Sequence, residues 1–182
     1  MERCFWCNLK NPIYVKYHDE EWGKECFEDA YLFEMLVLES FQTGLSWECV
    51  LNKREAFRES FDGFDFYKIA EYGDEKINSL CEDKSIIRNR RKIVATKNNA
   101  KAFILILEEF GSFLNYLRLF WDGTVIYDYV STSSALSLEI SNDLKKRGMS
   151  FVGTTVIFSY LQAIGVINSH TKNCFLFEEK YK

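Results

Sequence analysis

The chain of 182 residues contains a single proline, Pro12, and only two histidines, His18 and His170. It has no internal repeat, no low-complexity tract and no Gly/Ser-rich linker, which excludes a repeat array and a set of flexibly tethered domains. No apolar run reaches the ~20 residues that a membrane span requires, and no apolar signal segment follows the first Arg. We therefore expect a cytoplasmic protein without a membrane anchor.

The cysteines lack the regular spacing of a disulfide framework, although six are present, at positions 4, 7, 26, 49, 81 and 174. In a reducing compartment such residues are core thiols or metal ligands, so we expect no disulfide bonds. Hydrophobic residues make up 47% of the chain and aromatic residues 16%, which indicates a globular protein with a real core.

Helical spacing dominates the hydrophobic pattern, and we predict an all-α fold. The β-branched run at 124–130, TVIYDYV, is too isolated to build a sheet. Capping residues and stop signals predict the helix boundaries. The expected helices are one from Leu32 ended by Gly44, then 46–61, 65–72 with Asp65 as N-cap, 74–82 with Asp74 as N-cap, 89–110 ended by Gly111, one capped by Ser112, one in 134–147 ended by Gly148, and one from Thr154 or Thr155 to Ile164.

Glu39 is the residue that most requires an explanation, because it lies in the middle of the largely apolar stretch Leu32–Leu51. It shares a helix face with apolar residues three, four and seven positions before it. A buried carboxylate without a partner costs several kcal/mol or gives up its charge. The alternative is a core Glu bonded to a backbone amide or an Arg. Since Gly44 can break the helix and Trp47 begins the next one, we predict a pocket floor with an acid, an indole and an exposed turn.

Aromatic residues with polar tips gather before and after this helix. They are usually core residues, but a dry core would have to satisfy each indole N–H and phenol O–H. Close to a buried acid they form a slot that can stack a flat ring such as a flipped nucleobase. The residues concerned are Trp6, Tyr14, Tyr17, Trp22 and Trp47.

Positive charge is concentrated between residues 84 and 101, although the formal net charge is −4. This segment has no Asp or Glu. A solvated helix surface is the alternative reading. A short helix, a tight connection at 83–87 and a longer helix instead predict a helix-hairpin-helix that binds a DNA phosphate at its second N-terminus. The basic residues are Lys84, Arg88, Arg90, Arg91, Lys92, Lys97 and Lys101, with Lys145, Lys146 and Arg147 as a second phosphate contact.

Metal-ligand spacing appears at both ends of the chain. His170 and Cys174 are four positions apart, and Cys4 and Cys7 form a C-x₂-C pair. Spacing rules alone nominate these four as a closed tetrahedral zinc site. The alternative is that the thiols and the imidazole are ordinary core groups.

Several strings together resemble the 3-methyladenine DNA glycosylase I (Tag) family of base-excision repair. The resemblance runs from Met1 to about Cys174. It rests on MERCFWC, NPIYVKYHDEEWG, FEMLVLESFQTGLSW, IIRNRRKI, DLKKRGMSFVGTTVIFSYLQAIGVIN and the final His170/Cys174 pair.

This resemblance implies a helix-hairpin-helix DNA glycosylase fold with a zinc site that clamps the N- and C-terminal segments. It implies a monofunctional enzyme that flips and hydrolytically excises 3-methyladenine from alkylated double-stranded DNA, with one structural zinc ion. We expect a monomer of a single glycosylase unit over residues 1–182. The hairpin lobe would span about 28–150, and a zinc lobe would combine 1–27 with 151–182.

The resemblance also implies roles for individual residues. Its zinc ligands fall on Cys4, His18, His170 and Cys174, so His18 replaces Cys7. Its departures are Ser85 and Arg91, which stand where related sequences often carry glycine. The catalytic residues fall on Glu39 and Tyr17, and the substrate-binding residues fall on Tyr14, Trp47, Trp6, Trp22 and Ser159. The DNA contacts fall on Gly44 and Leu45, which fill the gap in the base stack, and on Ser85, Arg88, Arg90 and Arg91.

Two other functions are compatible with parts of this pattern. A zinc-stabilised DNA-binding module without catalysis would keep the basic hairpin and the metal clamp but would have no use for Glu39 among aromatic residues. A catalytic zinc hydrolase would need an open metal position, which four protein ligands do not leave.

Overall fold

The computed structural model describes residues 1–177, which form ten α-helices, one 3₁₀ helix and two short strands. In chain order these are α1 (Pro12–Glu20), α2 (Asp29–Gln42), α3 (Trp47–Leu51), α4 (Arg54–Ser60), η1 (Asp62–Phe64), α5 (Phe66–Ala70), α6 (Asp74–Glu82), α7 (Arg90–Phe110), α8 (Phe113–Leu117), β1 (Ile126–Tyr127), α9 (Ala135–Lys146), α10 (Thr154–Ala163) and β2 (Ile167–Asn168).

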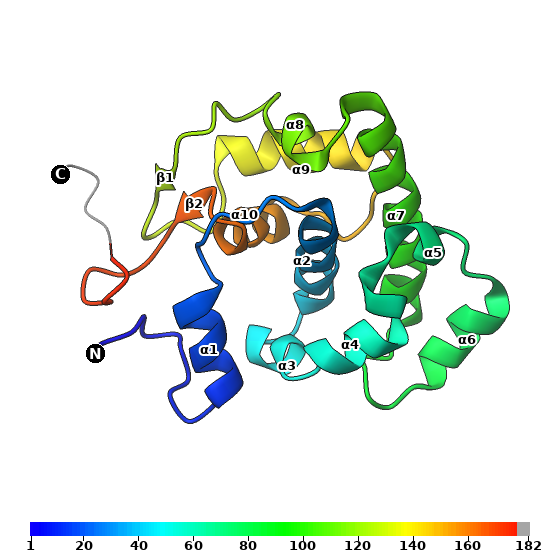
Figure 1. The fold of residues 1–182 in the computed structure, drawn as a ribbon, viewed down its shortest axis with the longest axis horizontal. Coiled ribbons are helices and arrows are strands. Elements are labelled where there is room, and N and C mark those ends of the chain that lie inside the picture. The colour runs from blue at the N-terminus through cyan, green and yellow to red at the C-terminus, as the bar shows by residue number, and fades with distance from the viewer. Residues whose placement is uncertain (178–182) are drawn as a thin grey trace.

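Helix α2 lies in the middle of the molecule and organises the core (Figure 1). All ten residues from Leu32 to Phe41 are buried, and α3, α7, α8 and α10 pack against the helix. Its end is as predicted, because Gly44 adopts a φ of +80°, which L-residues rarely adopt. The chain turns there, and α3 begins at Trp47.

Most of the predicted capping signals are confirmed. The Asp65 side chain accepts hydrogen bonds at the start of α5, Ser112 caps α8, and Gly111 ends α7 with a φ of +81°. The prediction that Asp74 is an N-cap is wrong, because Gly73 holds that position and Asp74 is the first helical residue. An acidic residue in a first turn is stabilised by the helix dipole, which accounts for the similar sequence signal.

Two predicted elements differ from the structure. The apolar rhythm of 46–61 is divided between α3 and α4, with a break at Asn52 and Lys53. The run at 124–130 is not isolated, since β1 pairs in parallel with β2 and aligns Ile126 with Ile167. Its partner is about 40 residues away in the sequence, so no local pattern could reveal it. The fold is therefore mostly helical with one minimal sheet.

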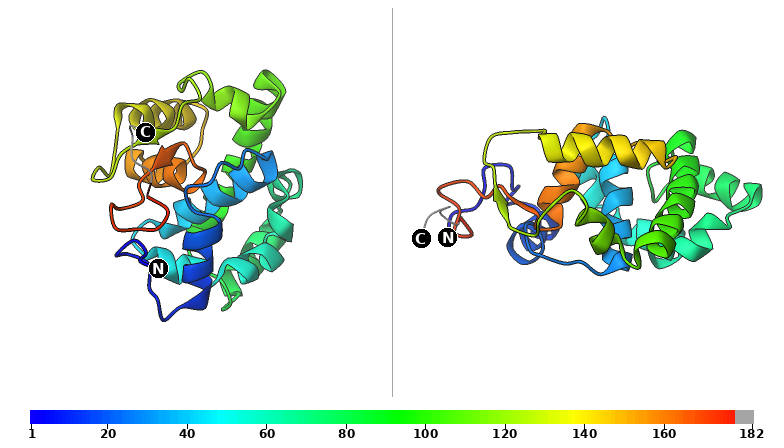
Figure 2. Two further views of the ribbon diagram at one scale, coloured as in Figure 1. Left: turned by 60° about the vertical axis from the view of Figure 1, so that its left-hand side comes forward. Right: turned by 90° about the horizontal axis from the view of Figure 1, so that it is seen from above.

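The two ends of the described chain lie together, on the side opposite α6 (Figures 1 and 2). The amide of Phe175 donates a hydrogen bond to the carbonyl of Glu2 at 2.9 Å. Helix α1, which the sequence analysis did not identify, carries Tyr14, Tyr17 and His18 into this region. Within residues 1–177, no helix combines the length and the apolar character that crossing a membrane requires.

Candidate active site and metal centre

A cavity of about 340 Å³ opens between α1, α2, α3 and α10. Each of the seven residues predicted for the base site lines it: Trp6, Tyr14, Tyr17, Trp22, Glu39, Trp47 and Ser159. The other wall was not predicted from the sequence and consists of Phe5, Gln42, Tyr129, Val130, Ser131, Thr132, Thr155, Phe158, Gln162, Ser169 and Thr171. Gln42 lies three positions after Glu39 on α2, and Thr155 lies four positions before Ser159 on α10, so helical spacing could have identified both. The loop at 129–132 has no such pattern in the sequence.

Glu39 is 4% exposed, and its Oε2 atom has no hydrogen-bond partner in the protein. Desolvation raises the pKa of the Glu39 carboxyl to about 8. Oε2 therefore has neither the backbone amide nor the Arg that the alternative of a core Glu requires. At neutral pH the free protein holds a mostly neutral carboxyl group that faces the cavity.

The same helix buries a second carboxylate, Glu34, which the sequence analysis did not consider. Oε1 of Glu34 accepts hydrogen bonds from Nε of Arg54 at 2.6 Å and from Nε of Arg58 at 2.9 Å. Glu34 is thus a structural acid with charged partners. The contrast shows that this fold can satisfy a buried carboxylate on α2, and that Glu39 is left without such a partner.

Two further polar atoms of the cavity wall lack partners, the hydroxyl of Tyr17 and Nε1 of Trp47. Burial, with the neighbouring Glu39 as a smaller cause, raises the pKa of Tyr17 well above its usual value, so its hydroxyl remains a donor. Buried polar groups are normally hydrogen-bonded. Two donors and an acid that converge without partners on one cavity mark a site for a ligand with polar edges.

The aromatic side chains contact one another around this cavity. The ring centroids of Tyr17 and Trp47 are 5.3 Å apart, and those of Trp6 and Trp22 are 4.7 Å apart. A flat ring placed between two others needs a spacing of about 7 Å, twice the van der Waals separation of about 3.5 Å. A flat ligand would therefore stack on one side of these pairs and not between their members.

The turn after α2 borders a second depression of about 270 Å³, which shares Glu39 and Ser159 with the first cavity. Leu45 is 42% exposed in this turn, and Gly44 precedes it. An apolar side chain is thus presented at the edge of the site on a turn that requires glycine.

The connection between α6 and α7 is held by side-chain hydrogen bonds. The amide and the hydroxyl of Ser85 donate to Oδ1 of Asp83, and Nζ of Lys53 donates to the carbonyl of Ser85. Ser85 has an ordinary negative φ, because the described non-glycine residues with positive φ are Asp62, Phe64 and Phe151. The turn therefore needs no left-handed backbone at Ser85, and the hydroxyl of Ser85 stabilises it.

The basic residues of this region do not form one uniform surface. Arg88 and Arg91 are exposed. Arg90 is also exposed but donates to Oδ1 of Asn78 on α6 at 2.7 Å. Lys92 is buried, which contradicts its inclusion in an exposed positive face.

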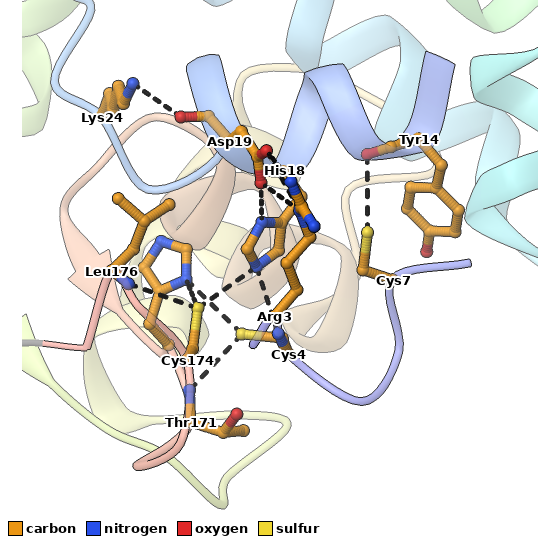
Figure 3. A network of polar contacts seen from close by, with 11 residues as sticks. Arg3, Cys4, Cys7, Tyr14, His18, Asp19, Lys24, Thr171, Cys174 and Leu176 are labelled. Atoms are coloured by element: carbon orange, nitrogen blue, oxygen red, sulfur yellow. Dashed lines mark hydrogen bonds and ion pairs between the residues drawn. The ribbon is translucent and has the colours of Figure 1, made fainter. Parts of the chain in front are cut away.

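Four buried residues, Cys4, His18, His170 and Cys174, form a group whose ligand atoms all lie within 4.8 Å of one another. Figure 3 shows how the chain ends bring the two cysteines to His18. Sγ of Cys174 lies 3.5 Å from Nε2 of His18 and 3.5 Å from Nδ1 of His170. Tetrahedral zinc with bonds of about 2.05 Å to nitrogen and 2.3 Å to sulfur separates these ligands by about 3.5 Å. The group therefore fits a metal ion of this kind.

Cys7 lies outside the group and donates instead to the carbonyl of Tyr14 at 3.8 Å. The structure thus assembles the set with His18 and not the set chosen by spacing alone. Burial raises the pKa of the Cys4 thiol to about 11. A bound cation would reverse this effect, because it stabilises the thiolate.

Comparisons with known proteins identify similar chains and structures. The family model for methyladenine glycosylase matches residues 6–177. DNA-3-methyladenine glycosylase 1 of Escherichia coli (strain K12) is 42% identical over 182 residues, 96% of each chain. A crystal structure of 3-methyladenine DNA glycosylase I (TAG) superimposes with a TM-score of 0.92 at 40% identity, covering 97% of this chain and all of the other. A variant of such an enzyme, crystallised in complex with 3-methyladenine, matches at 33% identity with a TM-score of 0.90, over 96% of each chain. With a match over nearly its whole length, the chain belongs to the methyladenine glycosylase family.

Proposed function

We propose that the protein is a DNA glycosylase that binds 3-methyladenine flipped out of alkylated DNA and hydrolyses its N-glycosidic bond, the first step of base-excision repair. Family membership supports this function. The structural observation that carries it is the partnerless carboxyl of Glu39 in an aromatic cavity of about 340 Å³. That cavity suits one flat base with polar edges.

Methylation at N3 makes the chemistry of excision mild. The modified purine is cationic while attached to the sugar, which weakens the glycosidic bond and makes the neutral base a good leaving group. The cation also offsets the desolvation that raises the pKa of Glu39, so the carboxylate forms as the base enters. Glu39 then accepts charge-assisted hydrogen bonds from the edge of the base.

The aromatic residues complete the recognition of the base. Tyr17 and Trp47 offer a ring surface and two partnerless donors. Tyr14, Trp6 and Trp22 wall the cavity, and the Ser159 hydroxyl lies beside it. Undamaged adenine is neutral and stacks better in the duplex. Flipping it costs a few kcal/mol, and no charge attraction to Glu39 offsets that cost. Water completes the hydrolysis at the sugar.

The DNA face combines the turn after α2 with a helix-hairpin-helix formed by α6 and α7. We propose that Leu45, which follows Gly44 in this turn, fills the gap that the flipped nucleotide leaves. Arg88 and Arg91 are exposed beside Ser85 at the start of α7, where a helix N-terminus favours a phosphate. Arg90, already bonded to α6, would stabilise the hairpin as well as add positive charge. We propose a monomer acting on double-stranded DNA.

The metal group has a structural function in this proposal. Cys4, His18, His170 and Cys174 would hold one zinc ion, which leaves no open coordination position for catalysis. The ion would clamp residues 1–27 to the C-terminal segment in a zinc lobe, beside a hairpin lobe of about 28–150. Such an ion would supply folding energy and would take no part in the reaction.

Release of free base from one alkylated duplex, followed by chromatography, tests the proposed function. Wild-type protein should release 3-methyladenine and leave the phosphodiester backbone intact. A zinc-stabilised DNA-binding module would bind the duplex and release nothing, which would refute the proposed activity.

A further inference from the structure

Lys92 is a buried cation that the proposed reaction does not use. Its side chain is 5% exposed, and burial lowers the pKa of its ammonium group. Nζ donates to the carbonyl of Phe41 at 2.8 Å and to the carbonyl of Thr43 at 2.6 Å. In the described part of the chain no carboxylate forms an ion pair with it. A charge held in this way acts on the backbone of the turn it contacts.

The two carbonyls belong to the C-terminal end of α2 and to the residue that precedes Gly44. They are the acceptors that a helix leaves without partners at its C-terminus, where the helix dipole also attracts a cation. Lys92 itself is in the first turn of α7, at the hairpin. Its side chain thus connects the turn that presents Leu45 with the helix proposed to hold the DNA phosphate.

A third segment meets the same ammonium group. The ring of Phe151 lies 6.0 Å from Nζ of Lys92, and Phe151 has a φ of +59°, a strained conformation for an aromatic residue. Next to it, Asn99 of α7 exchanges two hydrogen bonds with the backbone of Ser150. This loop leads into α10, whose Thr155 borders both depressions. Lys92 therefore lies at the junction of the turn, the hairpin helix and the loop before α10.

We propose that Lys92 is a positioning residue that fixes the Gly44–Leu45 turn relative to the hairpin, so that Leu45 reaches the gap left by a flipped nucleotide while the hairpin holds the backbone. This inference rests on the proposed function. Lys92 does not touch the base, because it is not among the residues that line the cavity. Its loss should therefore affect the recognition of opened DNA and leave the binding of free base unchanged.

The test compares wild type with Lys92→Met, which keeps an unbranched apolar side chain and removes the ammonium group. Lys68→Met is the control, because it removes one charge from an exposed position of α5, outside the hairpin. Two duplexes are titrated, one intact and one with a tetrahydrofuran abasic analogue beside 2-aminopurine. Free 3-methyladenine is titrated into each protein in parallel by tryptophan fluorescence.

Wild type and Lys68→Met should prefer the abasic duplex and change the 2-aminopurine signal. Lys92→Met should lose about tenfold of that preference, equivalent to 1.4 kcal/mol, and most of the signal change, with free-base affinity within about twofold of wild type. The inference is overturned if Lys92→Met keeps the wild-type preference for the abasic duplex. It is also overturned if the affinity of Lys92→Met for free base falls as much as that preference does. If Lys92→Met fails to fold, Lys92→Gln is tested in its place under the same criteria. Gln keeps a hydrogen-bond donor on a shorter side chain but removes the positive charge. A wild-type protein that binds neither free base nor the abasic duplex would refute the proposed function together with this inference.

Discussion

Nδ1 of His18 lies 2.8 Å from Oδ1 of Asp19. A carboxylate only accepts, so Nδ1 carries the proton and Nε2 faces the thiol of Cys174 with its lone pair. Arg3 holds the other side of Asp19, with Nη2 2.7 Å from Oδ2 (Figure 3). These contacts orient the ring of His18, which is the usual arrangement around metal-ligating histidines.

Removal of Cys174 should release the metal and destabilise the protein. A closed structural zinc site contributes its binding free energy to folding, so Cys174→Ser should lower the free energy of unfolding by several kcal/mol. Thermal unfolding and elemental analysis of the purified variants measure the two effects. Cys7→Ser is the matched control, since Cys7 is buried nearby but outside the ligand group. If Cys7→Ser loses zinc while His18→Ala retains it, the ligand assignment is wrong.

Replacing Asp19 should weaken metal binding without removing a ligand. Asp19→Asn keeps the size of the side chain but loses the charge that orients His18 and pairs with Arg3. Outer partners of this kind typically change metal affinity by about 10–100-fold. Competition with a chromogenic chelator gives the affinity, and a value equal to wild type would show that the ring is oriented by other contacts.

The exposed arginines of the hairpin should contact DNA phosphates without reading sequence. Arg88→Ala or Arg91→Ala should weaken the binding of all duplexes alike and make the slope of log K against log salt shallower by about 0.9 per lost contact. Fluorescence anisotropy at several salt concentrations measures this slope. Lys68→Ala on α5, outside the hairpin, controls for the change in net charge. An unchanged slope in both arginine variants would place the DNA face elsewhere.

Local chemistry made much of the fold predictable. Gly44 and Gly111 end helices because their positive φ values suit glycine, and Asp65 and Ser112 cap helices with their own side chains. The N-terminal helix could also have been found, since Asn11 caps it and Pro12 occupies its first position.

Tertiary relationships were not predictable in the same way. The pairing of β1 with β2, and the wall that 129–132 adds to the cavity, depend on segments distant in the sequence. The burial of Lys92 depends on carbonyls about 50 residues earlier, so a run of basic residues could not distinguish it from its exposed neighbours. Similarly, only the structure separates Glu34, which has arginine partners, from Glu39, which has a cavity.

The buried acid of the cavity should make the protein less stable as the pH rises. The folded pKa of Glu39 is about 8, against an ordinary value of 4.5, so the folded state binds this proton more tightly than the unfolded state. The free energy of unfolding therefore falls between about pH 4.5 and pH 8. Glu39→Gln has no such group and should exceed wild type in melting temperature at pH 8–9, with the difference disappearing near pH 5. A difference independent of pH would contradict the raised pKa.

Glu34→Gln is the control for this experiment and for the next. It changes the other buried acid of α2 and leaves the cavity unaltered. Loss of its ion pairs with Arg54 and Arg58 should lower the melting temperature at neutral pH. Base binding per folded molecule should remain normal.

Titration of free 3-methyladenine tests most directly whether Glu39 recognises the excised base. The proteins compared are wild type, Glu39→Gln and Glu34→Gln. The free base is neutral, but the protonated Glu39 carboxyl can share its proton with the base and so form the same charge-assisted hydrogen bond, which Gln cannot do. Glu39→Gln should therefore lose about 1.5–3 kcal/mol of binding free energy, roughly 10–150-fold in affinity. Base excision from an alkylated duplex should fall in parallel. If a folded Glu39→Gln binds free base normally while turnover drops by about 10²–10⁴, Glu39 activates water as a general base. Normal binding in that variant contradicts the recognition role.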